Sequence, residues 1–343
     1  MNREFLQLAH DFDLEKHRIG GMYMSEKLDG QRCFWDGGIS RGLLVNQVPW
    51  ANRDALGRTF NATGLWSRYG HPIHAPHWFV NSLPKIPLDG ELYLGRGRFQ
   101  ENGFVRGHDS NHHLWQEVKL HVFHSPTYEQ VFQEGRINNP NFQKIITSDV
   151  LKWVYEHGGE RRLGRSFDHV YDNLKNVDLG PTAVLLHQEK LPLDELEAKA
   201  MVIETLQTVN SVKGEGLILA DPHVVWLPKR TNTLLKVKQL HDAEATVIGY
   251  VSGRRTLKGS KLLGKIGALI VDWNGIKFEL AGLNDEERRL SDPTFASMHP
   301  GVEMPEKITS PHFPRGSVVT FQYTELTDDG KPKCARYYRR YGG

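Results

Sequence analysis

Residues 27–32, with the sequence KLDGQR, place an amine, a carboxylate and a guanidinium close together in the chain. A lysine acts as a nucleophile in its deprotonated form, which neighbouring cations, a metal ion or desolvation favour. An arginine suits a phosphate or a ribose, an aspartate suits a metal or a hydroxyl, and Gly30 lets the backbone approach a ligand closely. The pattern indicates nucleotidyl transfer. A solvated turn between two strands is the alternative, because so short a motif also recurs by chance.

Further residues of this kind follow in order along the chain. Residues 40–42 (SRG) are expected on the next strand, and residues 88–92 (LDGEL) place carboxylates beside a glycine on another strand. Phe123 closes an apolar strand, and residues 215–219 (EGLIL) bring another acid into a strand. Residues 234–238 (LLKVK) place two lysines on one face of a strand, because strand side chains repeat every two residues. The alternative roles are a core aromatic for Phe123, a surface residue for Arg41, a turn-shaping residue for Asp89, and an ion-paired sheet surface for Glu215, Lys236 and Lys238.

Several elements must position these residues. Short β-rich runs alternate with turns over the first 240 residues, with strands expected at 86–94, broken at 89–90, and at 118–123, 217–220 and 234–237. Helices are expected over 127–134, 148–157 and 193–210. In the last helix, the apolar residues near one face are Leu193, Leu196, Ala200, Ile203 and Leu206.

The pattern changes after about residue 240. Five short strands are expected at 243–251, 269–273, 277–280, 317–323 and 335–338, with turns at 274–275 and 328–330. Five strands in about 100 residues fit a small barrel of the oligonucleotide-binding (OB) type. We therefore expect two domains, residues 1–240 and 241–343.

Basic residues gather in this second part, although the total charge of +2 is too small to indicate nucleic-acid binding by itself. Basic residues interleaved with aromatics suit phosphates and sugars, while a solvated surface is the alternative. One group lies in a glycine-rich segment and comprises Arg254, Arg255, Lys258, Lys261 and Lys265. The other lies at the C-terminus, among Tyr337, Tyr338 and Tyr341, and comprises Lys331, Lys333, Arg336, Arg339 and Arg340.

Composition excludes several other classes of protein. With 39% hydrophobic and 24% charged residues, the chain resembles an ordinary globular protein, and no run of about 18 apolar residues or N-terminal signal pattern is present. The two cysteines, Cys33 and Cys334, do not suggest a disulfide framework, and the 17 histidines show no metal-ligand spacing. We expect a protein of a reducing compartment, the cytoplasm, with no membrane partner.

Taken together, the ordered motifs resemble the nucleotidyltransferase motifs of ATP-dependent DNA ligases, from about residue 20 to the C-terminus. Residues 27–32 correspond to motif I, 89–91 to motif III, Phe123 to motif IIIa, 215–216 to motif IV and 236–238 to motif V. The chain is similar to the minimal, bacteriophage-type members, which lack a separate N-terminal DNA-binding domain. The resemblance implies an α+β fold, with an antiparallel-sheet adenylation domain followed by an OB barrel.

The resemblance also implies a reaction and a role for each residue. Lys27 would attack the α-phosphate of ATP, and the adenylate would pass to the 5′-phosphate of a nick in duplex DNA, from which the 3′-hydroxyl displaces AMP. Glu91 would hold the ribose and Glu215 would hold Mg²⁺ or Mn²⁺, with Glu91 a further metal candidate. Lys236 and Lys238 would neutralise the α-phosphate and Phe123 would stack on adenine. Arg32 would contact the ribose or the nick, Asp29 would place the 3′-hydroxyl or the metal, and Arg41 would bind the 5′-phosphate.

DNA contacts of the second domain follow from the same resemblance. Basic residues of the loop 253–264 and of the C-terminal strand would contact the phosphate backbone, which gives affinity that depends on salt and not on sequence. The candidates are Arg254, Arg255, Lys258, Lys261, Arg336 and Arg339. The family acts in DNA replication, repair and recombination, and a monomer is expected.

Two features depart from the family pattern. Residues 158–162 (GGERR) have no assigned role beyond an exposed charged loop, and Ala335 stands where the closing motif commonly has a proline. The alternative functions are an RNA ligase or an mRNA capping guanylyltransferase of the same superfamily, or a non-catalytic nucleic-acid clamp. A clamp leaves Lys27, Glu91 and Glu215 without a role.

Overall fold

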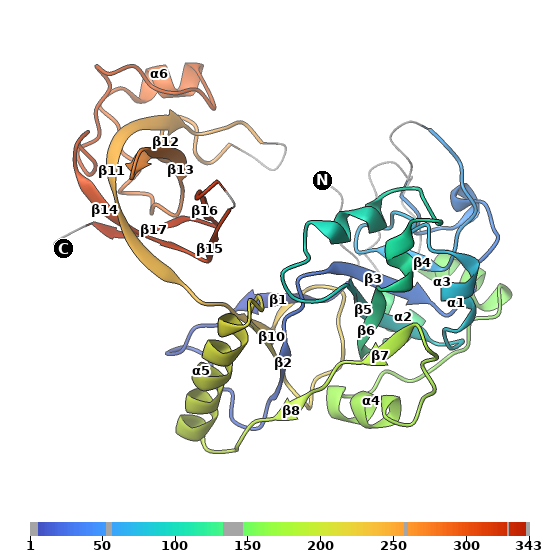
Figure 1. Ribbon diagram of the computed structural model, residues 1–343. Helices are drawn as coiled ribbons and strands as arrows, with labels where there is room; N and C mark the ends of the chain where they lie inside the picture. Colours follow the sequence, from blue (N-terminus) through green and yellow to red (C-terminus); the bar gives the residue numbers. More distant parts are fainter. Residues whose placement is uncertain (1–5, 53–56, 133–146, 257–259, 328, 341–343) are drawn as a thin grey trace. The chain divides into compact units, whose positions relative to one another are not determined.

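The computed structural model describes residues 6–52, 57–132, 147–256, 260–327 and 329–340. The chain divides into two compact units, Met1–Lys238 and Gln239–Gly343, here called the first unit and the second unit. Both are built mainly of strands with a few helices (Figure 1), so the predicted α+β class is confirmed.

Two five-stranded sheets form the first unit. Sheet I contains β1 (Leu8–Asp11), β2 (Tyr23–Glu26), β8 (Glu189–Lys190), β9 (Leu217–Ala220) and β10 (Arg230–Val237), in the order β1-β10-β9-β2-β8. Sheet II contains β3 (Gln31–Asp36), β4 (Leu65–Ser67), β5 (Pro87–Tyr93), β6 (Lys119–His124) and β7 (Ala183–Leu185), in the order β4-β3-β5-β6-β7. Neighbouring strands are antiparallel except for the pairs β1–β10 and β6–β7.

Five α-helices and three short 3₁₀ helices complete the described part of the first unit. The 3₁₀ helices are Val45–Gln47, Glu101–Arg106 and His113–Gln116. The α-helices are α1 (His77–Asn81), α2 (Tyr128–Val131), α3 (Thr147–Glu156), α4 (Phe167–Leu174) and α5 (Glu195–Ser211).

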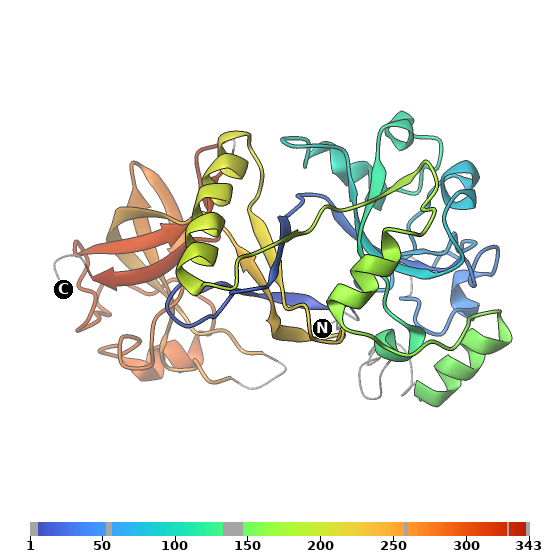
Figure 2. The same ribbon diagram turned by 90° about the horizontal axis from the view of Figure 1, so that it is seen from below.

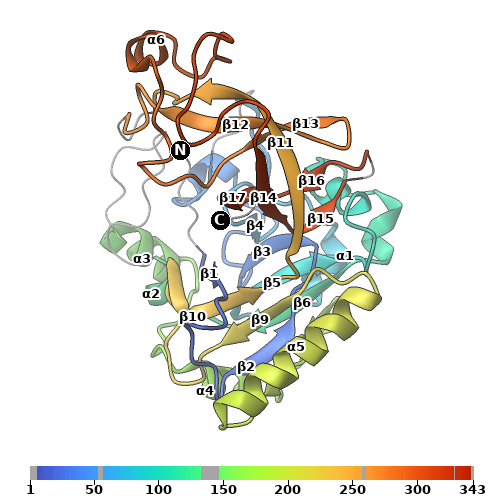
Figure 3. The same cartoon turned by 90° about the vertical axis from the view of Figure 1, so that its left-hand side faces the viewer.

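Helix α5 covers one face of sheet I (Figure 2 and Figure 3). Asp194 caps it by accepting hydrogen bonds from the backbone N–H groups of Leu196 and Glu197, both at 3.0 Å. Its buried row is Ala198, Val202 and Val209, which packs in one core with residues of β2, β9 and β10. The predicted helix is therefore confirmed.

The apolar residues expected near one face of this helix do not form its buried row. Leu193, which precedes the helix, is 85% exposed, Leu196 is 78% exposed and Ile203 is 44% exposed. Two rows of this helix carry apolar residues at helical spacing, and periodicity alone does not choose between them. The row that contains the small Ala198 packs on the sheet.

Sheet II forms the largest core of the first unit. Side chains alternate along β6, so Leu120 and Val122 are buried in this core together with Leu88 and Leu92 of β5. The predicted strand at 118–123 is thereby confirmed. The strand at 86–94 is present as β5, but it is not broken at 89–90: the chain stays extended there and only its register with β6 shifts.

The second unit is a sheet of five strands with two short additions. The five are β11 (His241–Ser252), β12 (Ile266–Trp273), β13 (Ile276–Leu280), β14 (Val318–Tyr323) and β17 (Arg336–Arg340), in the order β13-β12-β11-β14-β17. The additions are the strand pair β15 (Glu325–Leu326) and β16 (Pro332–Lys333), and the helix α6 (Pro293–Met298).

The long strand β11 curves (Figure 1) and pairs with β14 along its first half and with β12 along its second. A bridge between Ala281 and Arg336 joins the ends of the two edge strands, β13 and β17. All five predicted strands and the turn at 274–275 are confirmed; the turn at 328–330 includes Asp328, which lies outside the described residues.

Candidate active site

Lys27, Glu215 and Lys238 converge because they lie at the ends of three adjacent strands of sheet I. Lys27 follows β2, Glu215 precedes β9, and Lys238 follows β10. The ammonium groups of Lys27 and Lys238 each donate a hydrogen bond to a different oxygen of the Glu215 carboxylate. The three side chains are 14–25% exposed. One carboxylate therefore lies between two amines at the edge of the solvent.

Electrostatics favour the charged form of this carboxylate. Burial raises the pKa of Glu215, but the nearby charges of Lys27 and Lys238 outweigh it and hold the pKa below its ordinary value. Glu215 is thus an anion at neutral pH.

The backbone fixes the same arrangement through Gly216. The N–H of Lys27 donates to the carbonyl of Gly216 at 2.8 Å. Gly216 has φ +145°, and a Cβ there would lie 2.2 Å from the carbonyl oxygen of Val237. Only glycine lets β9 and β10 approach this closely, which explains why Glu215 is followed by a glycine.

Lys236 has a different partner from Lys238. Its ammonium lies 3.1 Å from a carboxylate oxygen of Asp11, at the end of the N-terminal strand β1. Asp11 is 64% exposed and Lys236 is 25% exposed. The two lysines of motif V are therefore held by separate acids, and Asp11 is a contact that no short motif indicated.

On sheet II, Arg32 is held rigidly. Its guanidinium donates two hydrogen bonds to the carboxylate of Asp89, from Nε at 2.6 Å and from Nη2 at 2.7 Å. The indole N–H of Trp226, in the segment between β9 and β10, donates to the same carboxylate at 3.0 Å. Asp89 is fully buried and Trp226 is 2% exposed. Asp89 thus positions Arg32 rather than only shaping a turn.

Phe123 lies next to this pair. The guanidinium of Arg32 stands 4.6 Å from the centre of the Phe123 ring. The register shift between β5 and β6 falls beside Phe123, because Asp89 is paired with His124 and Gly90 with Val122. The ring is half-buried and is not an ordinary core aromatic.

Glu91 lies opposite Arg32 on the neighbouring strand, β5. Gly30 passes directly over it, since a Cβ on Gly30 would lie 2.8 Å from Cγ of Glu91 and 2.4 Å from the Leu92 carbonyl oxygen. Burial raises the pKa of Glu91 to about 8, although Arg32 and Lys27 act in the opposite direction. A neutral carboxyl suits a sugar hydroxyl better than a metal ion.

Asp29 is half-buried between Lys27 and Gly30. Its backbone carbonyl accepts a hydrogen bond from the side-chain amide of Asn102 at 3.4 Å. Among the described residues there is no group of three or more acidic, histidine or cysteine side chains arranged to hold a metal ion.

Arg41 lies on a turn, so the strand expected at 40–42 is wrong. The buried carboxylate of Asp36 accepts hydrogen bonds from the Gly38 N–H at 2.9 Å and from the Ser40 hydroxyl at 2.5 Å. Gly42 has φ +79°, which suits a turn rather than a strand. From this turn the guanidinium of Arg41 donates to the side chain of Asn81 at the end of α1.

The basic residues of the second unit lie at its surface. Arg254 is 68% exposed, and its guanidinium lies 3.3 Å from a carboxylate oxygen of Glu279, which is 51% exposed. Both line a hollow of about 560 Å³ that also includes Thr256 and Lys261. Arg255, Arg336 and Arg339 are also exposed, and Lys258 lies outside the described residues.

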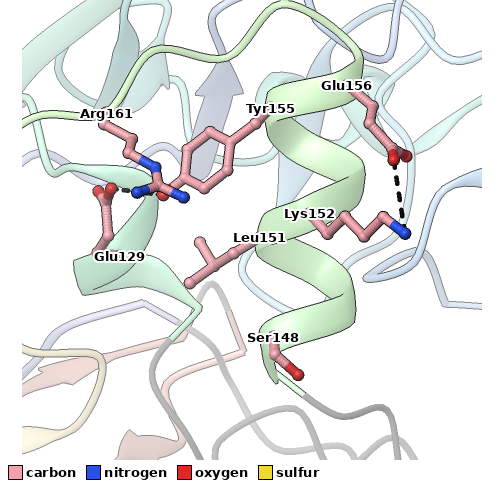
Figure 4. A pocket seen from close by; sticks show the side chains of 7 residues that line it. All are labelled: Glu129, Ser148, Leu151, Lys152, Tyr155, Glu156 and Arg161. Carbon is pink, nitrogen blue, oxygen red and sulfur yellow. Dashed lines mark hydrogen bonds and ion pairs between the residues drawn. The ribbon is translucent and has the colours of Figure 1, made fainter.

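Figure 4 shows a second hollow, of about 710 Å³, over α3. The Tyr155 hydroxyl donates to Glu129 at 2.5 Å, and the guanidinium of Arg161 lies 4.7 Å from the centre of the Tyr155 ring. The charged residues 160–162 are exposed, as expected. None of the predicted site residues lines this hollow.

Comparison with known proteins gives relatives along the whole chain. A family model described as the DNA ligase OB-like domain matches residues 259–340. A DNA ligase of Haemophilus influenzae is 24% identical over 335 residues, which cover 97% of this chain and 91% of that protein. A solved structure of Lig E DNA ligases is 27% identical, with a TM-score of 0.62 and 98% of each chain covered.

A further solved structure, Pmar-Lig_PreS3, is 21% identical, with a TM-score of 0.57, and the match covers 98% of this chain and 68% of that one. It supports the same fold. The chain is thus similar to DNA ligases along almost its whole length, and to their OB-like domain over residues 259–340. The predicted adenylation domain followed by an OB domain is confirmed. No helix among the described residues is long and apolar enough to cross a membrane.

Proposed function

We propose that this ligase uses ATP to seal nicks between a 5′-phosphate and a 3′-hydroxyl in duplex DNA, through an AMP carried on Lys27. The observation that carries the proposal is the convergence of Lys27, Glu215 and Lys238 at the ends of three adjacent strands. A lysine that only lies at the surface does not require a backbone contact with a buried glycine or a carboxylate shared with a second lysine. A lysine nucleophile needs both a fixed position and neighbouring charges.

In the first step the Lys27 amine attacks the α-phosphorus of ATP. A P–N bond forms, the bond to pyrophosphate breaks, and the amine loses a proton. The ion pair with Glu215 must open for this, because the same nitrogen supplies the hydrogen bond in the free protein. Lys238 is then placed to neutralise charge on the α-phosphate, which is the main requirement of phosphoryl transfer.

In the later steps the adenylate leaves Lys27 for the 5′-phosphate of the nick, and the 3′-hydroxyl then displaces AMP. Arg41, on its turn, would bind the 5′-phosphate, with Asn81 as the residue that holds the guanidinium beforehand. Asp29 would orient the 3′-hydroxyl. Lys236 would join Lys238 at the phosphate after leaving Asp11.

The residues present fit a magnesium ion that completes its coordination with water and phosphate oxygens. Mg²⁺ commonly uses one or two carboxylates and retains several waters, so three protein ligands are not required. Glu215 is the anionic candidate, with Asp29 second, and Mn²⁺ would serve in place of Mg²⁺. When bound, the ion would withdraw charge from the phosphate oxygens.

The nucleotide base and sugar would lie over sheet II. Phe123 offers a half-buried ring for stacking on adenine, and Arg32 and Glu91 offer hydrogen bonds to the ribose. Asp89 keeps Arg32 in place by accepting hydrogen bonds from two of its N–H groups, and the indole N–H of Trp226 donates to the same carboxylate. This side of the site is formed before the nucleotide binds.

The second unit, residues 241–343 in the proposed division, would bind the DNA backbone. Its exposed arginines at 254, 255, 336 and 339, with Lys261, suit phosphates, and Lys258 is proposed with them from the sequence. We propose that the protein acts as a monomer.

The experiment is incubation with α-labelled ATP and Mg²⁺, followed by addition of nicked duplex DNA. We expect label on the protein, its transfer to the 5′-phosphate, and a sealed strand. Label from GTP instead of ATP would favour a guanylyltransferase, and sealing that requires RNA in one strand would favour an RNA ligase. Absence of label from any nucleotide would contradict the proposal.

A further inference from the structure

Three residues form a row across sheet II. Arg32 of β3 lies directly opposite Glu91 of β5, and Glu91 lies directly opposite His121 of β6. Directly opposed residues of antiparallel strands project from the same face of a sheet. His121 therefore lies on the face that carries Arg32 and Glu91, on the other side of Glu91 from Arg32.

The contacts of His121 agree with this placement. Its ring meets the ring of Tyr93 edge-on, with centres 5.3 Å apart. Tyr93 follows Glu91 by two residues on β5 and so shares its face. His121 is half-buried, whereas Leu120 and Val122 on either side of it are fully buried in the core behind the sheet.

A half-buried histidine at this place has hydrogen-bonding capacity to offer a ligand. Within the described part of the chain, no protein group hydrogen-bonds to its ring nitrogens. Burial and the nearby charge of Lys119 lower the pKa of His121. The ring is neutral at neutral pH and presents one donor and one acceptor.

We propose that His121 is a specificity-determining residue that hydrogen-bonds a ribose hydroxyl of the bound nucleotide, flanking Glu91 opposite Arg32. The proposal rests on the proposed function, because it needs a nucleotide over sheet II. It assigns the sugar to the row Arg32–Glu91–His121 and the base to Phe123. The enzyme would then distinguish a ribonucleotide from its deoxy analogues by contacts on both sides of Glu91.

The test measures the rate of Lys27 labelling per unit nucleotide concentration with ATP, 2′-deoxy-ATP and 3′-deoxy-ATP. The central variant is His121→Phe, which keeps a ring against Tyr93 and removes both nitrogens. We expect it to lower the value for ATP by about 3- to 10-fold, the loss of one hydrogen bond, and to leave the value for one deoxy analogue unchanged. His121→Gln, which retains a donor and an acceptor, should recover part of the loss.

Lys119→Ala is the matched control. Lys119 lies on the same face two residues away and is exposed, so its loss should change the three nucleotides equally. An equal effect of His121→Phe on all three nucleotides would overturn the proposal and leave only a packing role. A wild-type enzyme that is labelled equally well by all three nucleotides would also overturn the proposal.

The failure of this proposal is separable from failure of the proposed function. If wild-type protein is labelled by ATP but His121→Phe keeps the wild-type preference for ATP over the deoxy analogues, only the proposed role of His121 is contradicted. If ATP does not label wild-type protein, both the proposed function and the role of His121 are contradicted.

Discussion

The two sheets of the first unit hold their charged residues in different ways. On sheet I, Lys27 and Lys238 share Glu215, and all three side chains retain contact with solvent. On sheet II, Arg32 is fixed by two hydrogen bonds to Asp89, which is fully buried and also bound by Trp226.

The difference corresponds to what each sheet must do. In the proposed reaction the groups on sheet I exchange partners, because Lys27 and Lys238 leave Glu215 for the phosphate. Arg32 has no such exchange to make, and a fixed position lowers the cost of ordering it when the nucleotide binds. We infer that sheet II is preorganised and that sheet I rearranges.

The largest effect on stability should come from breaking the buried pair. Asp89→Ala leaves the Arg32 guanidinium, which is 19% exposed, without its carboxylate, and Trp226 without its acceptor. We expect a loss of about 3 kcal/mol or more in the free energy of unfolding, measured by urea denaturation. A loss no larger than that of an exposed ion pair would remove the contrast between the two sheets.

The opposite pattern is expected on sheet I. Glu215→Gln keeps the shape of the side chain and removes the anion between two lysines, so adenylylation should fall on the order of 100-fold. The free energy of unfolding should change by less than in Asp89→Ala, because Lys27 and Lys238 are partly solvated. Labelling kinetics and urea denaturation of the same preparation test both parts. A variant that labels at the wild-type rate would show that Glu215 has no part in the first step.

Acid should destabilise the protein through His124, on the last residue of β6. His124 is 3% exposed, and burial lowers its pKa from 6.5 to about 3. The unfolded chain then binds a proton more readily, so the contribution of neutral His124 is complete above pH 6.5 and is lost as pH falls below it. His124→Phe should therefore gain about 2 kcal/mol over wild type between pH 7 and pH 5.

Urea denaturation at the two pH values measures this gain. His169 on α4 is exposed, so His169→Phe, which retains His124, should show no such gain over wild type. Parallel pH profiles for wild type and His124→Phe would mean that the buried histidine is not the acid-sensitive group.

The smallest effect is expected at a largely exposed ion pair, Arg254–Glu279, in the hollow of the second unit. In the proposed DNA contacts Glu279 competes with phosphates for Arg254, so Glu279→Gln should raise affinity for duplex DNA by up to about 5-fold at low salt. Fluorescence anisotropy over a range of salt concentrations measures it. Unchanged affinity would place the hollow outside the DNA-binding surface.

The sequence predicted the residues of the site better than their surroundings. The order of the motifs led to Lys27, Glu215 and Lys238, and the strands beside Glu215 and Lys238 were expected as the short apolar runs 217–220 and 234–237. Trp226, Asp11 and Asn81 were missed, since each meets its partner across a long stretch of chain and belongs to no short motif.

Two differences have local physical causes. Arg41 was expected on a strand, whereas the buried Asp36 and its hydrogen bonds to residues 38 and 40 build a turn. For α5 the apolar row noted in the sequence is largely exposed and a second row is buried, because both rows have helical spacing. Tertiary contacts decided both cases.

The most direct test of the central claim is to locate the nucleotide on the protein. The protein is incubated with ATP and Mg²⁺, digested, and analysed by mass spectrometry for a peptide carrying AMP. We predict AMP on Lys27 of the wild type and an unmodified Lys27→Ala variant. AMP on another lysine, or labelling of Lys27→Ala at the wild-type level, would contradict the account.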